Sequence, residues 1–376
     1  MSAAVVFLMA ALSAEVAWSP RLLLQTDGVW LHHGGTDATR LPEDAAPEEV
    51  GLTLRRARLG VDVDVGEGVG QGQGLWRARL VVSAERPEGT WPALTAADPV
   101  AGAPACAAPG WCLRTTEAYV GLAPHKAFGV WVGSMRVPIG LSRVVDESDL
   151  RLPERARIIL RATPDYRVGA KVAGDLGLLQ YALGIYSVGS GSTSSLLDTP
   201  FSRAGPLSVL RLSAEPVGPV GPTPWLRRVR APGAEEDPWD RWWRFSLGVS
   251  ALHARLPGAN QLGLGGDAQL QWAWFCATAE LLWTHRGTMD RLGFVIEPGV
   301  LVWRDRLELV VRGEFFNDDV GPRSPADLWG AALGVTVWSA TRLGRAELAY
   351  TLRGPLAGDG PLTGIALLRL QLAFPE

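Results

Sequence analysis

The sequence predicts an all-β fold, namely a transmembrane antiparallel β-barrel of about sixteen strands. Three observations predict it. From about residue 50 onward, polar and apolar residues alternate with a period of two. The alternating runs are about 10–14 residues long, whereas a strand that crosses a bilayer at a tilt needs roughly 9–11 and strands of soluble proteins average about 5–6. The chain also has 16 tryptophans among 376 residues, and amphipathic indole rings gather at membrane–water interfaces.

The alternation is clearest in three segments. In residues 57–65 every odd position is apolar, and in residues 76–85 every even position is apolar. Residues 306–316 repeat the pattern, with Leu307 and Leu309 on one face and charged residues on the other. We expect strands near 21–32, 52–65, 74–86, 113–123, 127–137, 165–174, 177–187, 206–216, 241–254, 264–274, 276–286, 292–303, 306–316, 328–339, 342–352 and 362–374.

The connections between these segments alternate between long and short, as the outer loops and periplasmic turns of a barrel do. The third long connection, at about 138–164, is loop three, and a loop of that length fills part of the lumen or covers its mouth. Residues 217–240, rich in proline and charge, break the rule because a short turn belongs there. They indicate either an insertion or a misread strand nearby.

The first residues form an apolar run followed by small side chains. We interpret residues 1–14 as an atypical signal peptide with a cut after Ala14, followed by a single barrel domain over 21–376. No later segment has about 18 uninterrupted apolar residues, the length of a membrane helix. Export without such a helix, combined with the strand pattern, favours the outer membrane of a Gram-negative bacterium. The alternative is that the chain is a soluble, secreted β-protein.

Composition argues against several classes of function. The net charge of −3 offers no cationic field for nucleic acid. The cysteines and the five histidines show no metal-ligand or catalytic spacing, so we expect no metal, no cofactor and no enzymatic activity. Cys106 and Cys112 share a loop rich in proline and alanine, where they either form a small disulfide or remain free thiols.

Four segments, in order along the chain, resemble the phosphate-selective porin family (porins O and P and their relatives). They are Leu54-Arg55-Arg56-Ala57-Arg58-Leu59-Gly60, Val132-Gly133-Ser134-Met135-Arg136-Val137-Pro138-Ile139-Gly140-Leu141, the run from Gly293 to Arg312, and Leu370-Gln371-Leu372-Ala373-Phe374. The resemblance implies a sixteen-stranded homotrimeric porin, embedded in outer-membrane lipid, whose third outer loop folds into the lumen. It also implies passive diffusion of small hydrophilic solutes, including anions such as phosphate. An outer-membrane barrel with a structural or adhesive role, or one for another solute, is the alternative.

Charges that line the narrowest part of a channel set its selectivity. The strand phases place four arginines on the lumen face of two neighbouring strands: Arg56, Arg58, Arg77 and Arg79. Guanidinium groups attract anions and bind phosphate through two hydrogen bonds. In the alternative interpretation, these arginines pair with acidic residues on the same faces, which are Asp62, Asp64 and Glu85.

Loop three offers a second set of cations, the candidates for a constriction. Its arginines are Arg143, Arg151, Arg155, Arg157 and Arg161. They either face the pore and attract anions or make structural ion pairs with acidic residues of the loop and the barrel wall. The family's phosphate specialists use lysines around the pore, whereas this chain has only Lys126 and Lys171. We therefore expect a weak anion preference without phosphate specificity.

Overall fold

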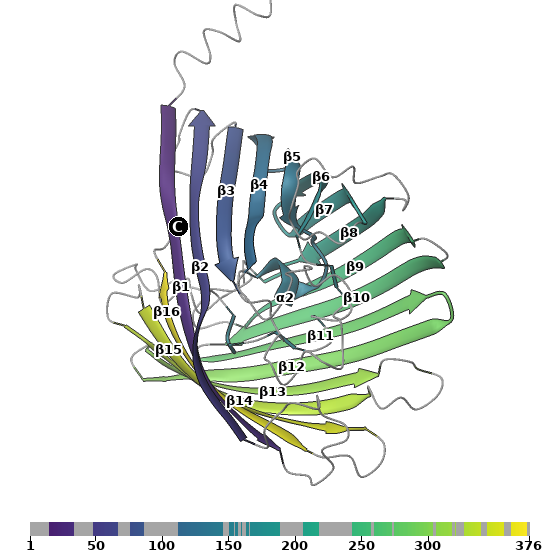
Figure 1. The fold of residues 1–376 in the computed structure, drawn as a ribbon. Helices are drawn as coiled ribbons and strands as arrows, with labels where there is room; N and C mark the ends of the chain where they lie inside the picture. The colour runs from purple at the N-terminus through teal and green to yellow at the C-terminus, as the bar shows by residue number, and fades with distance from the viewer. Residues whose placement is uncertain are drawn as a thin grey trace, which may run out of the picture.

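The computed structural model shows a closed barrel of sixteen strands (Figure 1). It describes residues 15–33, 48–66, 76–85, 112–145, 150–153, 155–156, 159, 163–164, 166–188, 206–217, 243–256, 259–272, 274–303, 306–317, 320, 327–339, 344–356 and 362–373. Among these residues, no helix is long and apolar enough to cross a membrane. The expected fold class and the expected number of strands are confirmed.

Each strand lies at the place in the chain where the alternation predicts it. The elements are β1 (Glu15–His33), β2 (Glu48–Gly66), β3 (Trp76–Glu85), β4 (Cys112–His125), β5 (Phe128–Arg136), α2 (Leu141–Val144), β6 (Tyr166–Asp175), β7 (Leu179–Tyr186), β8 (Leu207–Ala214), β9 (Arg244–Leu256), β10 (Ala259–Trp272), β11 (Phe275–Arg286), β12 (Met289–Trp303), β13 (Leu307–Asn317), β14 (Leu328–Trp338), β15 (Gly344–Pro355) and β16 (Thr363–Ala373).

Every strand pairs antiparallel with its neighbours in sequence, and β1 closes the barrel against β16. The closing register runs from Leu23 opposite Ala373 to His33 opposite Thr363. Closure satisfies the backbone groups that an open sheet edge would expose to lipid.

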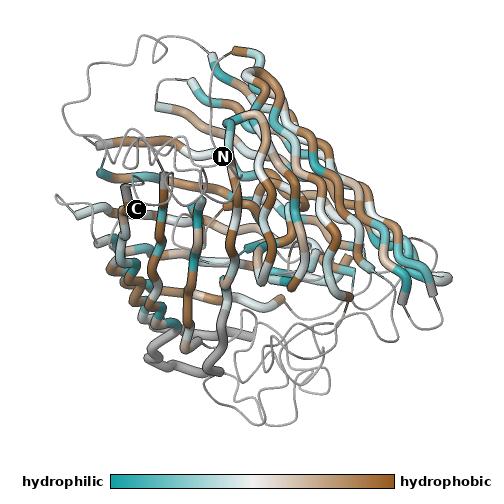
Figure 2. The backbone as a smooth tube through the Cα atoms, turned by 90° about the horizontal axis from the view of Figure 1, so that it is seen from above, coloured by the Kyte–Doolittle hydropathy of each residue, from teal (hydrophilic) through white to brown (hydrophobic). Residues whose placement is uncertain are grey.

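The two faces of the wall are inverted relative to a soluble protein. Large apolar side chains are exposed on the outside, such as Leu59 at 66% and Leu80 at 48%. Charged side chains are buried on the inner face, such as Arg56 at 1%. Figure 2 shows the alternation as brown and teal bands along the strands. A closed barrel with an apolar exterior and a polar interior is the architecture of bacterial outer-membrane proteins, so this chain is an outer-membrane barrel.

Strand β1 begins at Glu15, earlier than the expected start at residue 21. Its first residues extend the pairing with β2, and Val16 and Trp18 are exposed on the outer face. Proline interrupts a strand unless its missing N–H lies on an unpaired side. Pro20 lies opposite Val61 of β2, and among the described residues the register with β16 begins at Leu23. Residues 1–14, the expected signal peptide, lie outside the described residues, as does Cys106.

The connection at 217–240 is an insertion and not a misread strand. Strands β8 and β9, on either side of it, pair directly from Leu207 opposite Ala254 to Ala214 opposite Leu247. No strand is missing between them, so the long connection stands at the end of the barrel where the neighbouring pairs have short turns.

Candidate functional site

The segment between β5 and β6, which contains α2, packs against the inner face of the barrel. Its apolar side chains are nearly inaccessible, with Val137 1%, Ile139 0% and Ile159 1% exposed. They form one cluster with residues of the wall, including Tyr186 and Phe316. Burial of these side chains favours packing of the segment against the wall over extension into water.

Polar contacts tie the same segment to strands on the far side of the barrel. The Gly140 N–H donates to Ser250 Oγ of β9 at 3.2 Å, and the Ser142 N–H donates to Glu280 Oε1 of β11 at 2.8 Å. Arg151 Nε donates to Glu308 Oε1 of β13 at 2.8 Å.

Two wall arginines complete these contacts by donating to backbone carbonyls of the segment. Arg345 of β15 donates to the carbonyl of Leu150 at 2.9 Å, and Arg369 of β16 donates to that of Pro153. The segment therefore contacts the inner wall as far round as β16, the strand that closes the barrel.

The four predicted wall arginines lie on the inner faces of β2 and β3, and two of them make ion pairs. Arg77 Nε lies 2.7 Å from Asp64. Arg79 lies 2.6 Å from Asp62 and 3.0 Å from Glu117 on β4. The alternative interpretation of the sequence expects the pairs with Asp64 and Asp62, but it does not name Glu117, and the side chain of Glu85 lies outside the described residues. The carboxylates of these pairs compensate part of the positive charge of the wall.

The remaining two wall arginines contact neutral groups. Arg58 Nε donates to Ser83 Oγ at 2.9 Å, and Arg56 Nη1 donates to Gln25 Oε1 at 3.0 Å. Both side chains are almost fully buried in the inner wall.

Arg143 and Arg155 donate hydrogen bonds to groups within loop three itself. Arg143 donates to Thr163 Oγ1 at 2.8 Å, and Arg155 donates to the carbonyls of Ser142 and Val145, each at 3.0 Å. They hold the two limbs of the loop together. Arg157 and Arg161 lie outside the described residues.

Arg151 differs from Arg143 and Arg155 because it pairs with a carboxylate of the barrel wall, that of Glu308 on β13. Burial alone would lower its pKa, but the carboxylates of Glu308 and Glu297 raise the pKa of Arg151 above the ordinary arginine value. Its positive charge is therefore permanent.

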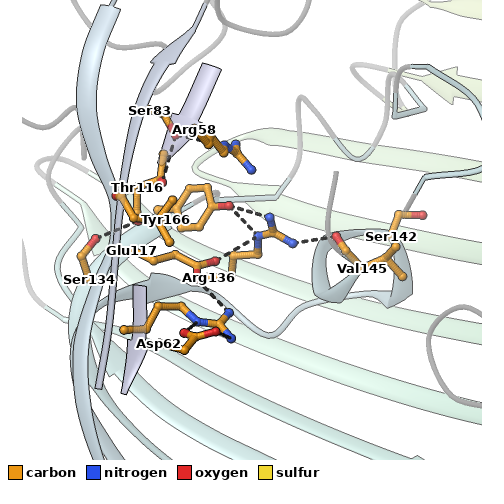
Figure 3. Close-up of polar contacts among 12 residues, drawn as sticks. Arg58, Asp62, Ser83, Thr116, Glu117, Ser134, Arg136, Ser142, Val145 and Tyr166 are labelled. Carbon is orange, nitrogen blue, oxygen red and sulfur yellow. Dashed lines mark hydrogen bonds and ion pairs between the residues drawn. The ribbon is translucent and has the colours of Figure 1, made fainter. Parts of the chain in front are cut away.

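Arg136, at the end of β5, joins the wall to loop three and was not among the predicted site residues. Its Nη1 donates to the Val145 carbonyl at 2.7 Å, its Nε donates to Tyr166 Oη at 2.8 Å, and Glu117 lies 4.0 Å away. Figure 3 shows Arg136 between Glu117 and Tyr166 of the wall and Val145 of the loop. Alternation counted from the exposed Val132 would place Arg136 outside, but β5 ends here and the chain turns into loop three.

Basic residues outnumber acidic residues among the charged side chains that the structure describes on β2 to β6. The bases are Arg56, Arg58, Arg77, Arg79, Arg136, Arg167 and Lys171, and the acids are Asp62, Asp64, Glu117 and Asp175. Lys171 pairs in register with Trp131, and its ammonium lies 5.1 Å from the centre of that ring.

Groups suited to metal binding or to acid–base chemistry are sparse. Within the described ranges, no group of three His, Cys, Asp or Glu side chains could hold a metal ion. His285 lies 3.0 Å from Asp290, where β11 turns into β12, and both side chains are partly exposed.

No protein-family profile and no curated protein sequence matches this chain, but many solved structures do. An anion-selective porin from Comamonas acidovorans is 11% identical, with 96% of this chain and 100% of that chain covered and a TM-score of 0.56. The outer-membrane channel DcaP of Acinetobacter baumannii is 9% identical, with 96% and 97% covered and a TM-score of 0.58. The trimer form of OmpT, an outer-membrane protein of Vibrio cholerae, is 10% identical, with 96% and 99% covered and a TM-score of 0.55. At these identities the likeness shows a shared fold, that of outer-membrane porins.

Proposed function

We propose that this protein is an outer-membrane porin, a water-filled channel for passive diffusion of small hydrophilic solutes with a weak preference for anions. The observation that carries the proposal is the polar, charged inner wall of a closed barrel, crossed by a segment that contacts the wall on the far side. Barrels of about 16 strands enclose an aqueous channel, whereas small barrels are filled by their own side chains.

Loop three is the in-folded constriction in this proposal. Its contacts with the wall lie on β9, β11, β13, β15 and β16. Among the described residues, the inner face of β2 and β3 lies on the other side of the lumen, and Arg136 of β5 links loop three to that side. Solutes pass between loop three and that basic wall.

The surplus of bases on β2 to β6 supports the anion preference. Fixed charge acts on passing ions over about one Debye length, roughly 8 Å at physiological salt, so side chains on the wall of the passage have the strongest effect. Arg56, Arg58, Arg77 and Arg79 are its cations, whereas Arg143 and Arg155 act by holding the loop in place. Phosphate specificity is not part of the proposal, because Arg77 and Arg79 are already paired with carboxylates.

The remaining features follow from the channel proposal. We propose a homotrimer in outer-membrane lipid, supported by the trimer form of the structurally similar OmpT. We propose neither an enzymatic activity nor a cofactor or nucleic-acid partner.

The test is conductance in planar bilayers, comparing the wild type with a deletion of residues 142–160. If loop three narrows the passage, the deletion increases single-channel conductance. A deletion of residues 219–237 is the matched control, because it removes the same number of residues from the connection between the paired ends of β8 and β9. Failure of the inserted wild type to conduct, or equal conductance of the wild type and the loop-three deletion, contradicts the proposal.

A further inference from the structure

Lys171 stands apart from the other inner-wall cations. Within the part of the chain that the structure describes, no carboxylate lies within ion-pair distance of its ammonium group, and its recorded contact is the ring of Trp131 at 5.1 Å. The side chain is half-buried in the middle of β6, so water in the lumen reaches it. A cation–π contact stabilises an ammonium less than an ion pair does, so Lys171 has capacity for an anion.

The wall around Lys171 is shaped by glycines. A Cβ atom at Gly121 would lie 2.2 Å from Trp131 Cδ1, and one at Gly129 would lie 2.4 Å from Trp131 Cη2. The indole therefore lies flat along the wall because these positions have no side chain. The lumen side of the ring is then available to Lys171 and to a ligand bound beside the lysine.

Tyr186 supplies a second polar group at the same place. Its side chain is fully buried, and its hydroxyl has no hydrogen-bond partner in the described structure. A Cβ atom at Gly184 would lie 2.5 Å from that hydroxyl. Because Gly184 is the register partner of Lys171, the hydroxyl lies on the inner face over β7, the strand that pairs with that of Lys171. A buried hydroxyl without a partner costs free energy, which a ligand that accepts its hydrogen bond recovers.

We infer that Lys171, Tyr186 and Trp131 form a binding site inside the channel for the carboxylate of a small organic monoanion. This inference rests on the proposed channel function and names the class of solute that the channel prefers.

The charge of the site suits a single carboxylate. It provides one ammonium, a point charge with three donors, and one hydroxyl. The arginines on the neighbouring strands are already engaged, Arg79 with Asp62 and Arg136 with Tyr166 and the loop. A divalent oxyanion would find only one uncommitted cation here.

The surroundings suit an organic body attached to that carboxylate. Trp131 and Tyr119 both pack against the large apolar cluster beneath loop three. An apolar group held against these rings is removed from water, which adds to the affinity of the anion by the hydrophobic effect.

The site is tested by calorimetric titration of the folded, detergent-solubilised protein with sodium phenylacetate, acetate and phosphate. We expect phenylacetate to bind more tightly than acetate, and phosphate no more tightly than acetate. Lys171→Gln weakens phenylacetate binding roughly ten-fold, the effect of losing one charge-assisted hydrogen bond. Lys171→Arg retains most of the affinity, and Tyr186→Phe loses a few-fold.

Lys126→Gln is the matched control, because Lys126 is an exposed lysine in the turn between β4 and β5 and the same change there leaves binding unaltered. Unchanged heat-modifiable migration shows that each variant is folded. Equal affinities of folded Lys171→Gln and wild type overturn the site, and so does a Lys171-dependent preference for phosphate. The titration needs no ion flow. A barrel that binds phenylacetate through Lys171 but conducts no ions would therefore contradict the channel proposal and leave the site standing.

Discussion

The inner wall places opposite charges next to one another at several buried positions. Arg369 of β16 and Asp27 of β1 make two hydrogen bonds of 2.7 Å each across the seam that closes the barrel. Gln25 and Gln371 add a third bond at 2.6 Å across the same seam. Because these groups are almost fully buried, removing one member leaves the other without compensation.

Arg369→Gln should therefore destabilise the barrel by about 3 kcal/mol, the loss expected when one member of a buried ion pair is removed. Equilibrium unfolding in urea from lipid vesicles measures it. The double variant Arg369→Gln with Asp27→Asn removes both charges and should recover much of the loss. A double variant as unstable as the single one would show that the charge pair is not what holds the seam.

Arg151 sets the charge balance where loop three meets β13. Replacing it by Gln removes the cation that pairs with Glu308, so the reversal potential in a salt gradient should move toward cations. Arg151→Gln combined with Glu308→Gln is the control, and it should return the potential toward the wild-type value. A single variant with an unchanged potential would place this pair away from the passage.

Contacts between individual side chains are what the sequence predicts least well. It placed Arg77 and Arg79 on the correct face, but their pairing with Asp64 and Asp62 depends on the register between strands. In the sequence, Lys171 stands out only as one of two lysines. Its role depends on Trp131, Gly184 and Tyr186, which are brought together by three strands and share no sequence motif.

At the scale of the element, period-two alternation was sufficient to locate all sixteen strands. The pattern is strong because one face meets lipid and the other meets water along the whole strand. The inner face is not polar where loop three packs, since Leu207 and Val209 of β8 are buried apolar residues on that face. Inner-face apolar residues at one end of neighbouring strands are the sequence signal that could have predicted where the loop packs.

The outer face gives a prediction for a single strand. Leu80 of β3 is 48% exposed and faces lipid, so Leu80→Arg should cost roughly 2–4 kcal/mol near the bilayer midplane. Leu80→Ala, which introduces no charge, is the control and should cost much less. Unfolding free energies in vesicles measure both, and equal losses would contradict the lipid-facing assignment.

The alternation alone predicts that arginine substitutions at the inward-facing Gly60 and Ser83 are mild, but the structure makes both positions sensitive. A Cβ atom at Gly60 would lie 2.8 Å from the carbonyl oxygen of Leu80. Ser83 is fully buried and bonded to Arg58 and Thr116. At these two positions the inner wall is closely packed, which the period of two does not reveal.

At the scale of the whole molecule, the barrel combines an apolar exterior, a closed ladder and a charged interior. The protein should extract with membranes and migrate differently on gels before and after heating. Recovery of a stable monomer without detergent would contradict the membrane assignment.

The basic wall and loop three together define the expected electrical behaviour of the whole channel. Arginine stays protonated from about pH 5 to 9, so an anion preference based on it should persist over that range. A preference that depended on histidine would be lost as pH rises through about 6.5.

The reversal potential of single wild-type channels in a KCl gradient tests the central claim most directly. If solutes pass between loop three and the basic inner face of β2 to β6, the potential has the sign of a modest anion preference. Arg77→Gln combined with Arg79→Gln should then move it toward cations. A wild-type channel that prefers cations, or a potential that is unchanged in the double variant, would contradict the account.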